Sequence, residues 1–377
     1  MRVGVSALLL RTEGGFQKAG ICRYIIRMLD EFAAHPEGDE FVVFVPDDVE
    51  LAPNWLAAPH LTFERVVIKN RLHRVWWEHT SARQWVRLRG LDVWFSTAQC
   101  TPFACGAPRA TMVHDLIPIF YPQFFSWEMA AYQKWTIRHS CRAAELIMTS
   151  TQSVRDDIVR TYGTPKERIA IAPLGPGNTP PPVSRDQASR EVLQRHGVEF
   201  ERYLFTLSTL EPRKNLVRVF EALKELKDDP GLGFVVGGAK GWKESDIFER
   251  LRELGVEDRV KFLGYVDDED LPHLFARAEA FVYASIYEGF GIPVLEAMLM
   301  GTPVVASRQA ALVEVGGEVA RYFEPNDPVD IARAIRETLS APDREERIAA
   351  GFARAKQFGW AECSRLTREA ISRLVQP

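Results

Sequence analysis

Cysteine pairs at the spacing of a metal or redox site are missing from this chain of 377 residues. Its five cysteines, an odd number, include no Cys-x-x-Cys pair; they are Cys22, Cys100, Cys105, Cys141 and Cys363. A chain of this length can bury a core without covalent crosslinks. The cysteines are therefore expected as reduced thiols in a cytosolic protein.

Long hydrophobic runs are also missing. The most apolar segment near the N-terminus, Val3–Leu10, is too short to cross a bilayer, and Arg11 and Glu13 follow it closely. This segment predicts a first buried strand rather than a membrane span or a signal peptide. The expected location is the cytoplasm, and peripheral contact with the inner face of the cytoplasmic membrane stays open.

Charge of one sign is not in excess. The chain has 47 Lys and Arg against 51 Asp and Glu, a formal net charge of −4 and a pI near 6.1. This balance argues against a protein devoted to non-specific binding of nucleic acid. The sequence also lacks a phosphate loop, a Gly-x-Gly-x-x-Gly fingerprint, a nucleophile elbow and a His-Glu-x-x-His helix.

Short apolar segments of strand length alternate with longer amphipathic segments. Such alternation indicates βαβ units, in which helices cover both faces of a parallel sheet. The expected fold class is α/β, with two Rossmann-like doubly wound domains facing across a cleft and ligand loops beyond the carboxyl ends of the strands. The expected strands are Val3–Leu10, Glu40–Val45, Asp92–Ser96, Ala110–Val113, Tyr203–Thr209, Gly233–Val236, Val260–Phe262, Ala280–Ala284 and Pro303–Ser307. The expected helices include Ile21–Ala34, Trp127–Ala144, Leu216–Leu226, Asp246–Leu254 and Leu271–Ala278.

A segment rich in proline and glycine, Ala172–Val183, interrupts this alternation near the middle of the chain. Such a composition suits neither a helix nor a strand and marks a boundary between domains. The expected organisation is an N-terminal domain over residues 1–175, a linker region over 176–199, a C-terminal domain over 200–357 and a final segment over 358–377.

A glycine-containing loop and a short helix follow the expected strand Ala280–Ala284. Gly289 and Gly291 allow the backbone to turn sharply and approach a ligand, and the helix N-terminus favours an anion there. Glu288 and Glu296 could each take the hydroxyls of a different sugar ring around a central phosphate. Alternatively, the two carboxylates only stabilise the helix N-terminus.

A second loop, Leu210–Asn215, follows the expected strand Tyr203–Thr209. Arg213 and Lys214 are expected in the first turn of the next helix, where two adjacent cations oppose the helix dipole. A local rule broken in this way indicates a functional site, and a diphosphate would make the pair favourable. Alternatively, Glu211 partly neutralises the cations and both are simply solvated.

His114 and Asp115 end a strand of the N-terminal half. The imidazole could bond a hydroxyl or a phosphate, and the carboxylate could orient it or act as a base; a structural histidine is the alternative. The loop Glu13–Gly20 could bring backbone close to a phosphate or an acceptor, or could be a turn.

The acidic run Asp268–Asp270 has the Asp-x-Asp spacing of metal-dependent sugar transferases. It directly precedes an expected helix, so a role as N-cap and dipole partner is favoured. No metal site is expected.

Several of these segments resemble motifs of one family, the retaining glycosyltransferases of family 4 with the GT-B fold. The resemblance covers nearly the whole chain, is more specific in the second half, and is greatest to bacterial mannosyltransferases of polysaccharide or O-antigen biosynthesis. The segments that carry it are Glu288–Glu296 for the Glu-x7-Glu signature, Leu210–Asn215 for the donor-phosphate motif, Gly264–Val266 with Leu271 for the nucleotide-side loop, His114–Pro118 for the active-site loop of the first domain, Ala19–Tyr24 for the first helix, and Phe358–Trp360 for a crossover helix returning to that domain.

The resemblance implies transfer of a hexose with retention and without a metal or other cofactor. It implies catalytic roles for His114, Asp115, Arg213, Lys214 and Glu288, with the cations on the donor diphosphate. The implied donor site consists of Gly15, Ser208, Arg213, Lys214, Gly238, Tyr265, Val266, Leu271, Glu288, Gly289, Phe290, Gly291, Ile292 and Glu296. Ser208 departs from the family pattern, because many members have glycine there; its hydroxyl either narrows the pocket or bonds a phosphate oxygen.

The same resemblance makes residues 1–175 the acceptor side and residues 200–357 the nucleotide-sugar side. GDP-mannose is the expected donor, with UDP-hexose second, and the expected acceptor is a saccharide or a lipid-linked saccharide; no nucleic acid is expected as a partner. Two other functions stay open, a nucleotide-sugar epimerase on the same fold and a non-catalytic saccharide- or nucleotide-binding protein.

Basic residues alternate with tryptophan in the segment Arg65–Arg89. This composition suits an anionic membrane surface, because tryptophan prefers the interface. The expected acceptor or membrane face consists of Arg71, Arg74, Trp76 and Trp77. The alternative is an ordinary amphipathic helix whose tryptophans pack inward.

Overall fold

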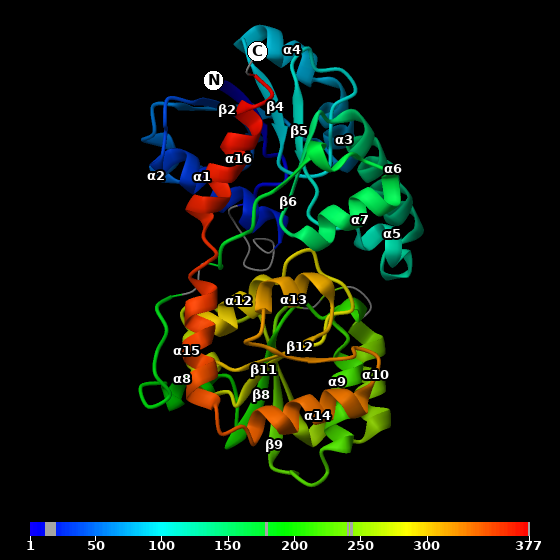
Figure 1. Ribbon diagram of the computed structural model, residues 1–377, viewed down its shortest axis with the longest axis vertical. Helices are drawn as coiled ribbons and strands as arrows, with labels where there is room; N and C mark the ends of the chain where they lie inside the picture. The colour runs from blue at the N-terminus through cyan, green and yellow to red at the C-terminus, as the bar shows by residue number, and fades with distance from the viewer. Residues whose placement is uncertain (12–19, 178–179, 240, 242–243, 376–377) are drawn as a thin grey trace. The chain divides into compact units, whose positions relative to one another are not determined.

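The computed structural model describes residues 1–11, 20–177, 180–239, 241 and 244–375. The chain divides into two compact units, and each is built on its own parallel sheet (Figure 1). The first unit comprises Met1–Gly175 together with Gly359–Pro377, and the second comprises Pro176–Phe358. Residues 176–199, expected as a linker, thus belong to the second unit, where Arg190–Arg195 forms helix α8.

The first unit has a seven-stranded sheet in the order β3-β2-β1-β4-β5-β6-β7, and all its pairings are parallel. The strand order reverses between β1 and β4, as in doubly wound folds. The strands are β1 (Arg2–Ser6), β2 (Glu40–Pro46), β3 (Leu61–Val66), β4 (Val93–Ser96), β5 (Arg109–Met112), β6 (Leu146–Thr149) and β7 (Ile169–Ile171).

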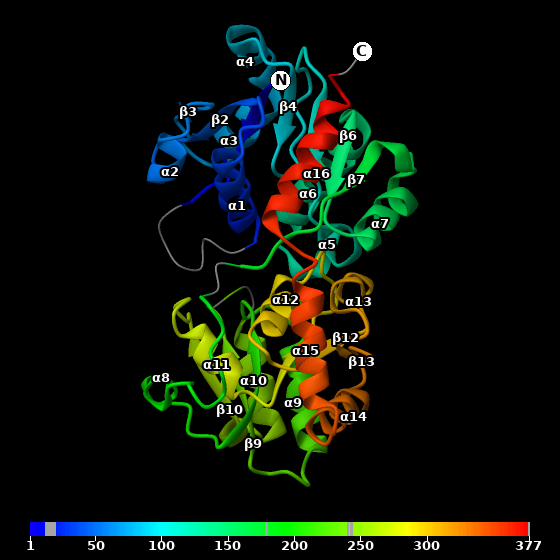
Figure 2. The ribbon, with the colours of Figure 1, turned by 60° about the vertical axis from the view of Figure 1, so that its left-hand side comes forward.

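Helices cover both faces of this sheet. On one face lie α1 (Ile21–Ala34), α2 (Pro53–Leu56) and α16 (Trp360–Ser372); on the other lie α3 (Arg71–Thr80), α4 (Ala82–Arg89), α6 (Trp127–Ala143) and α7 (Gln152–Tyr162). The short helix α5 (Ile117–Phe120) packs against α6. Figures 1 and 2 show the C-terminal helix α16 beside α1, so the first unit is closed by the last helix of the chain.

Arg368 fixes α16 in that place. Its buried guanidinium donates to the carbonyl oxygens of His35 and Pro36 and to Asp39 Oδ2, 2.9 Å from Nε. The charge and all these donors are therefore satisfied inside the first unit.

The second unit has a six-stranded parallel sheet in the order β10-β9-β8-β11-β12-β13. Its strands are β8 (Arg202–Leu207), β9 (Leu232–Gly237), β10 (Val260–Gly264), β11 (Ala280–Tyr283), β12 (Val304–Ser307) and β13 (Arg321–Phe323). The central strands are buried on both faces, which explains their continuous apolar sequences. The order reverses between the neighbours β8 and β11.

The core of the second unit lies largely between its sheet and α9 (Leu216–Glu225), α10 (Glu244–Leu254) and α14 (Pro328–Leu339). The remaining helices are α11 (Leu271–Arg277), which contacts α8, α12 (Ile292–Leu299), which contacts α15 (Arg344–Ala355), and α13 (Ala310–Gly316).

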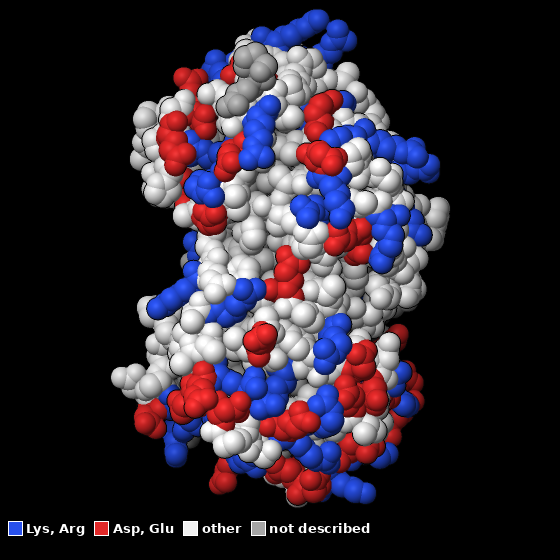
Figure 3. Space-filling view, viewed as in Figure 1, with Lys and Arg blue, Asp and Glu red and all other residues white. Residues whose placement is uncertain are grey.

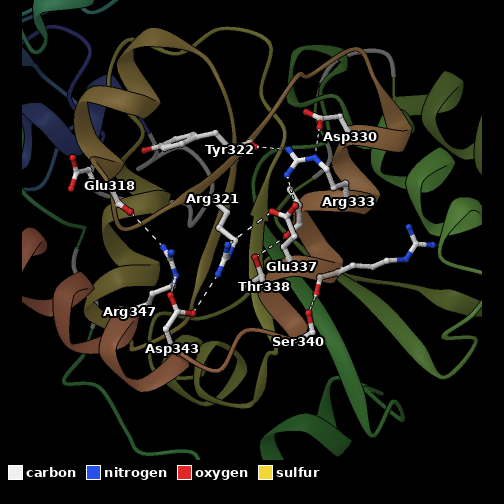
Figure 4. A network of polar contacts seen from close by, with 12 residues as sticks. Glu318, Arg321, Tyr322, Asp330, Arg333, Glu337, Thr338, Ser340, Asp343 and Arg347 are labelled. Atoms are coloured by element: carbon white, nitrogen blue, oxygen red, sulfur yellow. Dashed lines mark hydrogen bonds and ion pairs between the residues drawn. The ribbon is translucent and has the colours of Figure 1, made fainter.

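A polar network on the surface joins β13, α14 and α15 (Figure 4). Arg333 bonds Asp330 and Glu337, and Asp343 pairs with Arg321 and Arg347. Figure 3 shows the alternating charges that such pairs leave over the second unit. The network anchors surface helices, and exposed pairs of this kind contribute little to stability individually.

The nine strands expected from the sequence are present, although β1 ends at Ser6, before the expected Leu10. The structure adds β3, β6, β7 and β13, three of which are at sheet edges. All five cysteines are buried, and none forms a disulfide with another described residue. Among the described residues, no helix is both long enough and apolar enough to span a membrane.

Candidate active site

The loops that carry Arg213 and Glu288 meet where the strand order of the second sheet reverses. They follow β8 and β11, which are paired in parallel, so both emerge at the same edge. Ile286 N donates to the Arg213 carbonyl at 2.9 Å and joins the two loops directly. This reversal is where doubly wound sheets bind ligands.

The sequence predicted Arg213 and Lys214 in the first turn of α9, but the structure places them before it. Pro212–Lys214 forms a separate 3₁₀ turn, and Asn215, at φ 60°, divides it from α9. The inference from the sequence that the two cations oppose the dipole of α9 from within its first turn is therefore wrong. What holds the two cations in place is a carboxylate on the neighbouring loop.

Glu288 Oε1 is the common partner of both cations. It lies 2.6 Å from Lys214 Nζ and 3.1 Å from Arg213 Nη1. Glu211 Oε2 lies 2.7 Å from Arg213 Nε on the other side of the guanidinium. The alternative, in which Glu211 partly neutralises the cations and both are solvated, is not met, because the Lys214 side chain is only 8% exposed.

Burial and charge compete in setting the ionisation of this cluster. Burial alone would raise the pKa of Glu288, but Lys214 and Arg213 lower it to about 2. Burial and the adjacent Arg213 lower the pKa of Lys214 against the attraction of Glu288. Burial also opposes the charge of Arg213, yet Glu288 and Glu211 raise its pKa. Glu288 is therefore ionised and compensates cations in a poorly solvated site.

Tyr283 and Gln309 support Glu288 and were missed from the sequence. The Tyr283 hydroxyl accepts from Lys214 Nζ at 2.7 Å and donates to Glu288 Oε1 at 2.9 Å. Gln309 Nε2 donates to the Glu288 carbonyl at 3.3 Å. A usable signal was the tyrosine at the end of an otherwise apolar buried strand, because a buried hydroxyl needs a partner.

Gly238 and Ser208 lie at the same sheet edge. Gly238, at φ 136°, follows β9, and a Cβ there would stand 1.9 Å from the Ser208 carbonyl oxygen, so only glycine fits. The Ser208 hydroxyl is buried and has no hydrogen-bond partner among the described residues. Such a group is costly unless a ligand satisfies it.

The other residues of the implied donor site surround this cluster along the chain. Phe290 is buried with its ring edge-on to Phe358, and Gly291, at φ 104°, begins α12. Glu296 is buried in the second turn of α12. Gly289 is buried and Ile292 half-buried; after β10, Tyr265 is half-exposed, whereas Val266 and Leu271 are buried.

Asp270, the last residue of the acidic run Asp268–Asp270, stands at the N-cap position of α11, as expected. Its carboxylate makes no side-chain cap, however, and instead bonds His196 Nε2 at 2.7 Å, together with Arg195. It therefore ties α8 to α11. Among the described residues, no group of three or more His, Cys, Asp or Glu is arranged to hold a metal ion.

His114 and Asp115 lie in the first unit, after β5. His114 Nε2 donates to the Thr97 carbonyl at 3.0 Å, and the ring is edge-on to Tyr24. Burial lowers the pKa of His114 to about 4, so the imidazole is neutral and Nδ1 is an acceptor. Thr97, not Asp115, orients this ring; Asp115 Oδ1 accepts from Ile117 N at 3.0 Å.

The expected membrane face must be corrected. Trp77 is buried against Phe44 and Trp94, because it belongs to the inward side of α3. Arg74 is half-buried beside Glu78. Arg71 and Trp76 are exposed as expected, whereas Gly15 and most of its loop lie outside the described residues.

Comparisons with known proteins agree with this architecture. Residues 190–353 match the family described as "Glycosyl transferases group 1", and residues 19–175 match "Glycosyltransferase Family 4". The O-antigen chain mannosyltransferase B of Escherichia coli is 35% identical over 268 residues, 70% of each chain.

Solved structures show the same fold. A sucrose-phosphate synthase from Thermosynechococcus elongatus has a TM-score of 0.75 at 17% identity, covering 99% of this chain and 98% of its own. The Anabaena protein HepE in complex with UDP-glucose has a TM-score of 0.71 at 20% identity, covering 99% and 100%.

Two doubly wound units of this kind have the GT-B fold, and the matches to both family models define the chain as a glycosyltransferase of that fold. The family models match both units, and one relative is a mannosyltransferase. These two findings identify the family within that class. The chain belongs to glycosyltransferase family 4.

Proposed function

We propose that this enzyme transfers mannose from GDP-mannose, with retention of anomeric configuration, to a saccharide or lipid-linked saccharide acceptor in O-antigen or related polysaccharide biosynthesis. The observation that carries the proposal is the set of buried Lys214 with half-buried Arg213 and Glu288 where the sheet order reverses. The mannosyltransferase relative supports the sugar and the pathway. UDP-hexose is the second donor, supported by the UDP-glucose complex of a fold neighbour.

The cations are the proposed ligands of the donor diphosphate. Arg213 offers a planar fork and Lys214 a point charge, which together match a diphosphate and the charge that grows on it as the bond to the sugar breaks. With this charge supplied by the protein, the transfer needs no metal. Ser208 Oγ gives a phosphate oxygen the hydrogen bond that its burial leaves unmade.

The carboxylates are the proposed ligands of the two sugar rings. Glu288 contacts the transferred hexose, and Glu296 takes the ribose hydroxyls. In the first unit, neutral His114 offers Nδ1 as an acceptor for a sugar hydroxyl, and Asp115 orders the loop that carries it. The bond from the anomeric carbon to phosphate oxygen breaks, the acceptor oxygen forms the new bond on the same face, and its proton passes to the leaving diphosphate.

A panel of nucleotide sugars tests the donor. We expect GDP-mannose to raise the melting temperature most, because stabilisation grows with affinity at fixed concentration. Turnover should persist in excess EDTA, and NMR should show the product with the donor's anomeric configuration. Inversion, or complete loss of turnover in EDTA, would contradict the corresponding part of the proposal.

Two alternatives give different results in the same assays. An epimerase would convert a nucleotide sugar with no acceptor present. A non-catalytic binding protein would bind without turnover of any donor. The presence of both cations and both carboxylates, buried or half-buried, argues against the binding protein. The mannosyltransferase relative argues against the epimerase, which a donor-only incubation tests directly.

We also propose that the first unit contacts anionic membranes peripherally. Exposed Leu72 and Trp76 lie on α3, and exposed Trp127 and Trp135 lie on α6. Arg71 joins the two helices by donating to Met129 Sδ at 2.9 Å. Figure 3 shows basic side chains, with acidic ones among them, over the region of α6 and α7; the basic ones suit an anionic surface.

Flotation with vesicles that contain or lack anionic phospholipid tests this surface. The double change Leu72→Ser and Trp76→Ser should reduce flotation with anionic vesicles. The control is Leu56→Ser, which changes another exposed leucine, this one on α2, on the other face of the first sheet. Wild-type protein that does not float with anionic vesicles would refute the membrane proposal.

A further inference from the structure

Tyr283 is the neutral member of the charged cluster. It ends β11 and is 2% exposed, and its ring lies 5.0 Å from Lys214 Nζ as well as stacking on Phe281. Its hydroxyl stands between the ammonium, at 2.7 Å, and Glu288 Oε1, at 2.9 Å. One hydroxyl thus contacts both a cation assigned to the diphosphate and the carboxylate assigned to the sugar.

Three donors converge on the same oxygen, Glu288 Oε1. Two are the cations, Lys214 and Arg213, and the third is the Tyr283 hydroxyl. A bound diphosphate would compete with Glu288 for both cations, because it carries more negative charge and accepts the same hydrogen bonds. It would not compete for the tyrosine, which already donates its proton to Glu288.

With the nucleotide sugar bound, Glu288 therefore needs a partner that it does not need in the free enzyme. When the cations turn toward phosphate oxygens, the Glu288 carboxylate would lose its charged partners while still buried. A buried carboxylate without hydrogen-bond donors is unfavourable and free to change rotamer. A hydroxyl that stays in place when the cations move, and still donates a hydrogen bond to Glu288, would hold the carboxylate where it is.

We propose that Tyr283 is a positioning residue: its hydroxyl holds Glu288 against the transferred sugar after Arg213 and Lys214 engage the diphosphate. This inference rests on the proposed function. Tyr283 itself touches neither donor nor acceptor in this account. Its effect should appear in the bound complex and its transition state rather than in donor capture.

The test is Tyr283→Phe, which keeps the ring packed on Phe281 and removes only the hydroxyl. We expect kcat to fall at least about ten-fold, the loss that follows removal of a hydrogen bond to a charged group. The KM and Kd of the donor should change less than about two-fold, because the diphosphate contacts remain. Circular dichroism should show the wild-type fold.

Tyr203→Phe is the matched control. Tyr203 is equally buried in the same sheet, but at the opposite end of β8, where its hydroxyl donates to the Leu274 carbonyl at 2.7 Å. We expect it to lower the melting temperature and leave kcat unchanged. If Tyr283→Phe does not fold, Tyr283→Leu, which also lacks the hydroxyl, takes its place.

The outcomes separate this inference from the proposed function. Wild-type protein that binds no nucleoside diphosphate by calorimetry would refute the proposed function itself. If Tyr283→Phe turns over as fast as wild type, or if only the KM of the sugar donor changes, the role of Tyr283 is overturned and the proposed function is not. A fall in kcat at constant KM, absent from Tyr203→Phe, supports it.

Discussion

Glu288 and the two cations beside it form a set of charges from which no single member can be removed without leaving another uncompensated. Lys214 is buried, and the Glu288 side chain is 12% exposed. Attraction in so poorly solvated a place is strong, but so is the cost of an unpaired charge. Because these charges compensate one another, loss of one destabilises the set, and an added anion can take the place of Glu288 as the partner of the cations.

Replacing Glu288 by glutamine tests that dependence on charge. Breaking a buried pair leaves Lys214 and Arg213 facing each other, so Glu288→Gln should lower the free energy of unfolding by about 3 kcal/mol. Added nucleoside diphosphate should raise its melting temperature more than that of wild type, since it supplies the missing charge. Chemical denaturation and thermal scans with and without ligand measure both effects.

Glu211→Gln is the control for Glu288→Gln. Glu211 also pairs with Arg213, but its side chain is 27% exposed, so the expected loss is within about 1 kcal/mol. Equal destabilisation by the two changes would show that Glu288 does not dominate the cluster.

His114 gives stability a dependence on pH. Its pKa in the folded protein is about 4, against 6.5 for the unfolded side chain. The unfolded state therefore takes up the proton first as pH falls. Stability from His114 is fully present above pH 6.5 and is lost as pH falls toward about 4. His114→Gln should flatten this part of the stability curve, by about 1 to 3 kcal/mol between those limits. Unchanged curvature would contradict burial of the neutral ring.

At the scale of elements, the site lies at the ends of the strands. The sequences of the strands explain which of them could be predicted and which could not. Continuous apolar segments such as β8 and β11 were predictable because both faces are covered. The edge strand β3 is buried only at its two end residues, and β7 and β13 have three residues each, so none carries that signal. The four residues of β6, although buried, are too few to distinguish from the end of a helix.

The candidate site was predicted in its residues but not in its contacts. Arg213, Lys214 and Glu288 were singled out, yet their direct pairing depends on strand order, which joins positions 75 residues apart. Tyr283 was missed although a buried strand that ends in tyrosine was a signal, and the partners of its hydroxyl again depend on how the loops meet. The exposed or buried side of α3 was likewise open, and packing against Trp94 decided it for Trp77.

Gly238 tests how tightly the β8 and β9 loops must approach. Gly238→Ala should cost more than about 1 kcal/mol and reduce donor affinity, because its φ is 136° and a Cβ would overlap the Ser208 carbonyl. The control, Gly231→Ala, introduces a Cβ with no atom within 4 Å and should be tolerated. Melting temperatures and donor titrations compare the two; wild-type behaviour of Gly238→Ala would contradict the close approach.

At the scale of the whole molecule, the chain leaves the first unit at Gly175 and returns to it at Gly359. The returning helix α16 is part of the first core rather than a tail. Trp360 contacts Gly175 so closely that a Cβ on that glycine would lie 2.4 Å from Trp360 Cδ1. The first unit is therefore assembled from both ends of the sequence.

Arg368→Met should destabilise the first unit selectively. It leaves Asp39 and two carbonyl oxygens without their buried donor, at a cost of about 2 to 4 kcal/mol. Arg365→Met, which removes an exposed arginine paired to Glu362, should change little. Hydrogen exchange resolves the two units, and equal loss of protection in both would contradict this assignment.

The central claim is that the paired cations at the strand reversal exist to bind a diphosphate. Calorimetric titration of GDP into wild-type protein, Arg213→Ala and Arg138→Ala tests it most directly, because Arg138 is an exposed arginine of the first unit. The account predicts measurable binding that weakens at least about ten-fold in Arg213→Ala and is unchanged in Arg138→Ala. Equal affinity in all three proteins would contradict it.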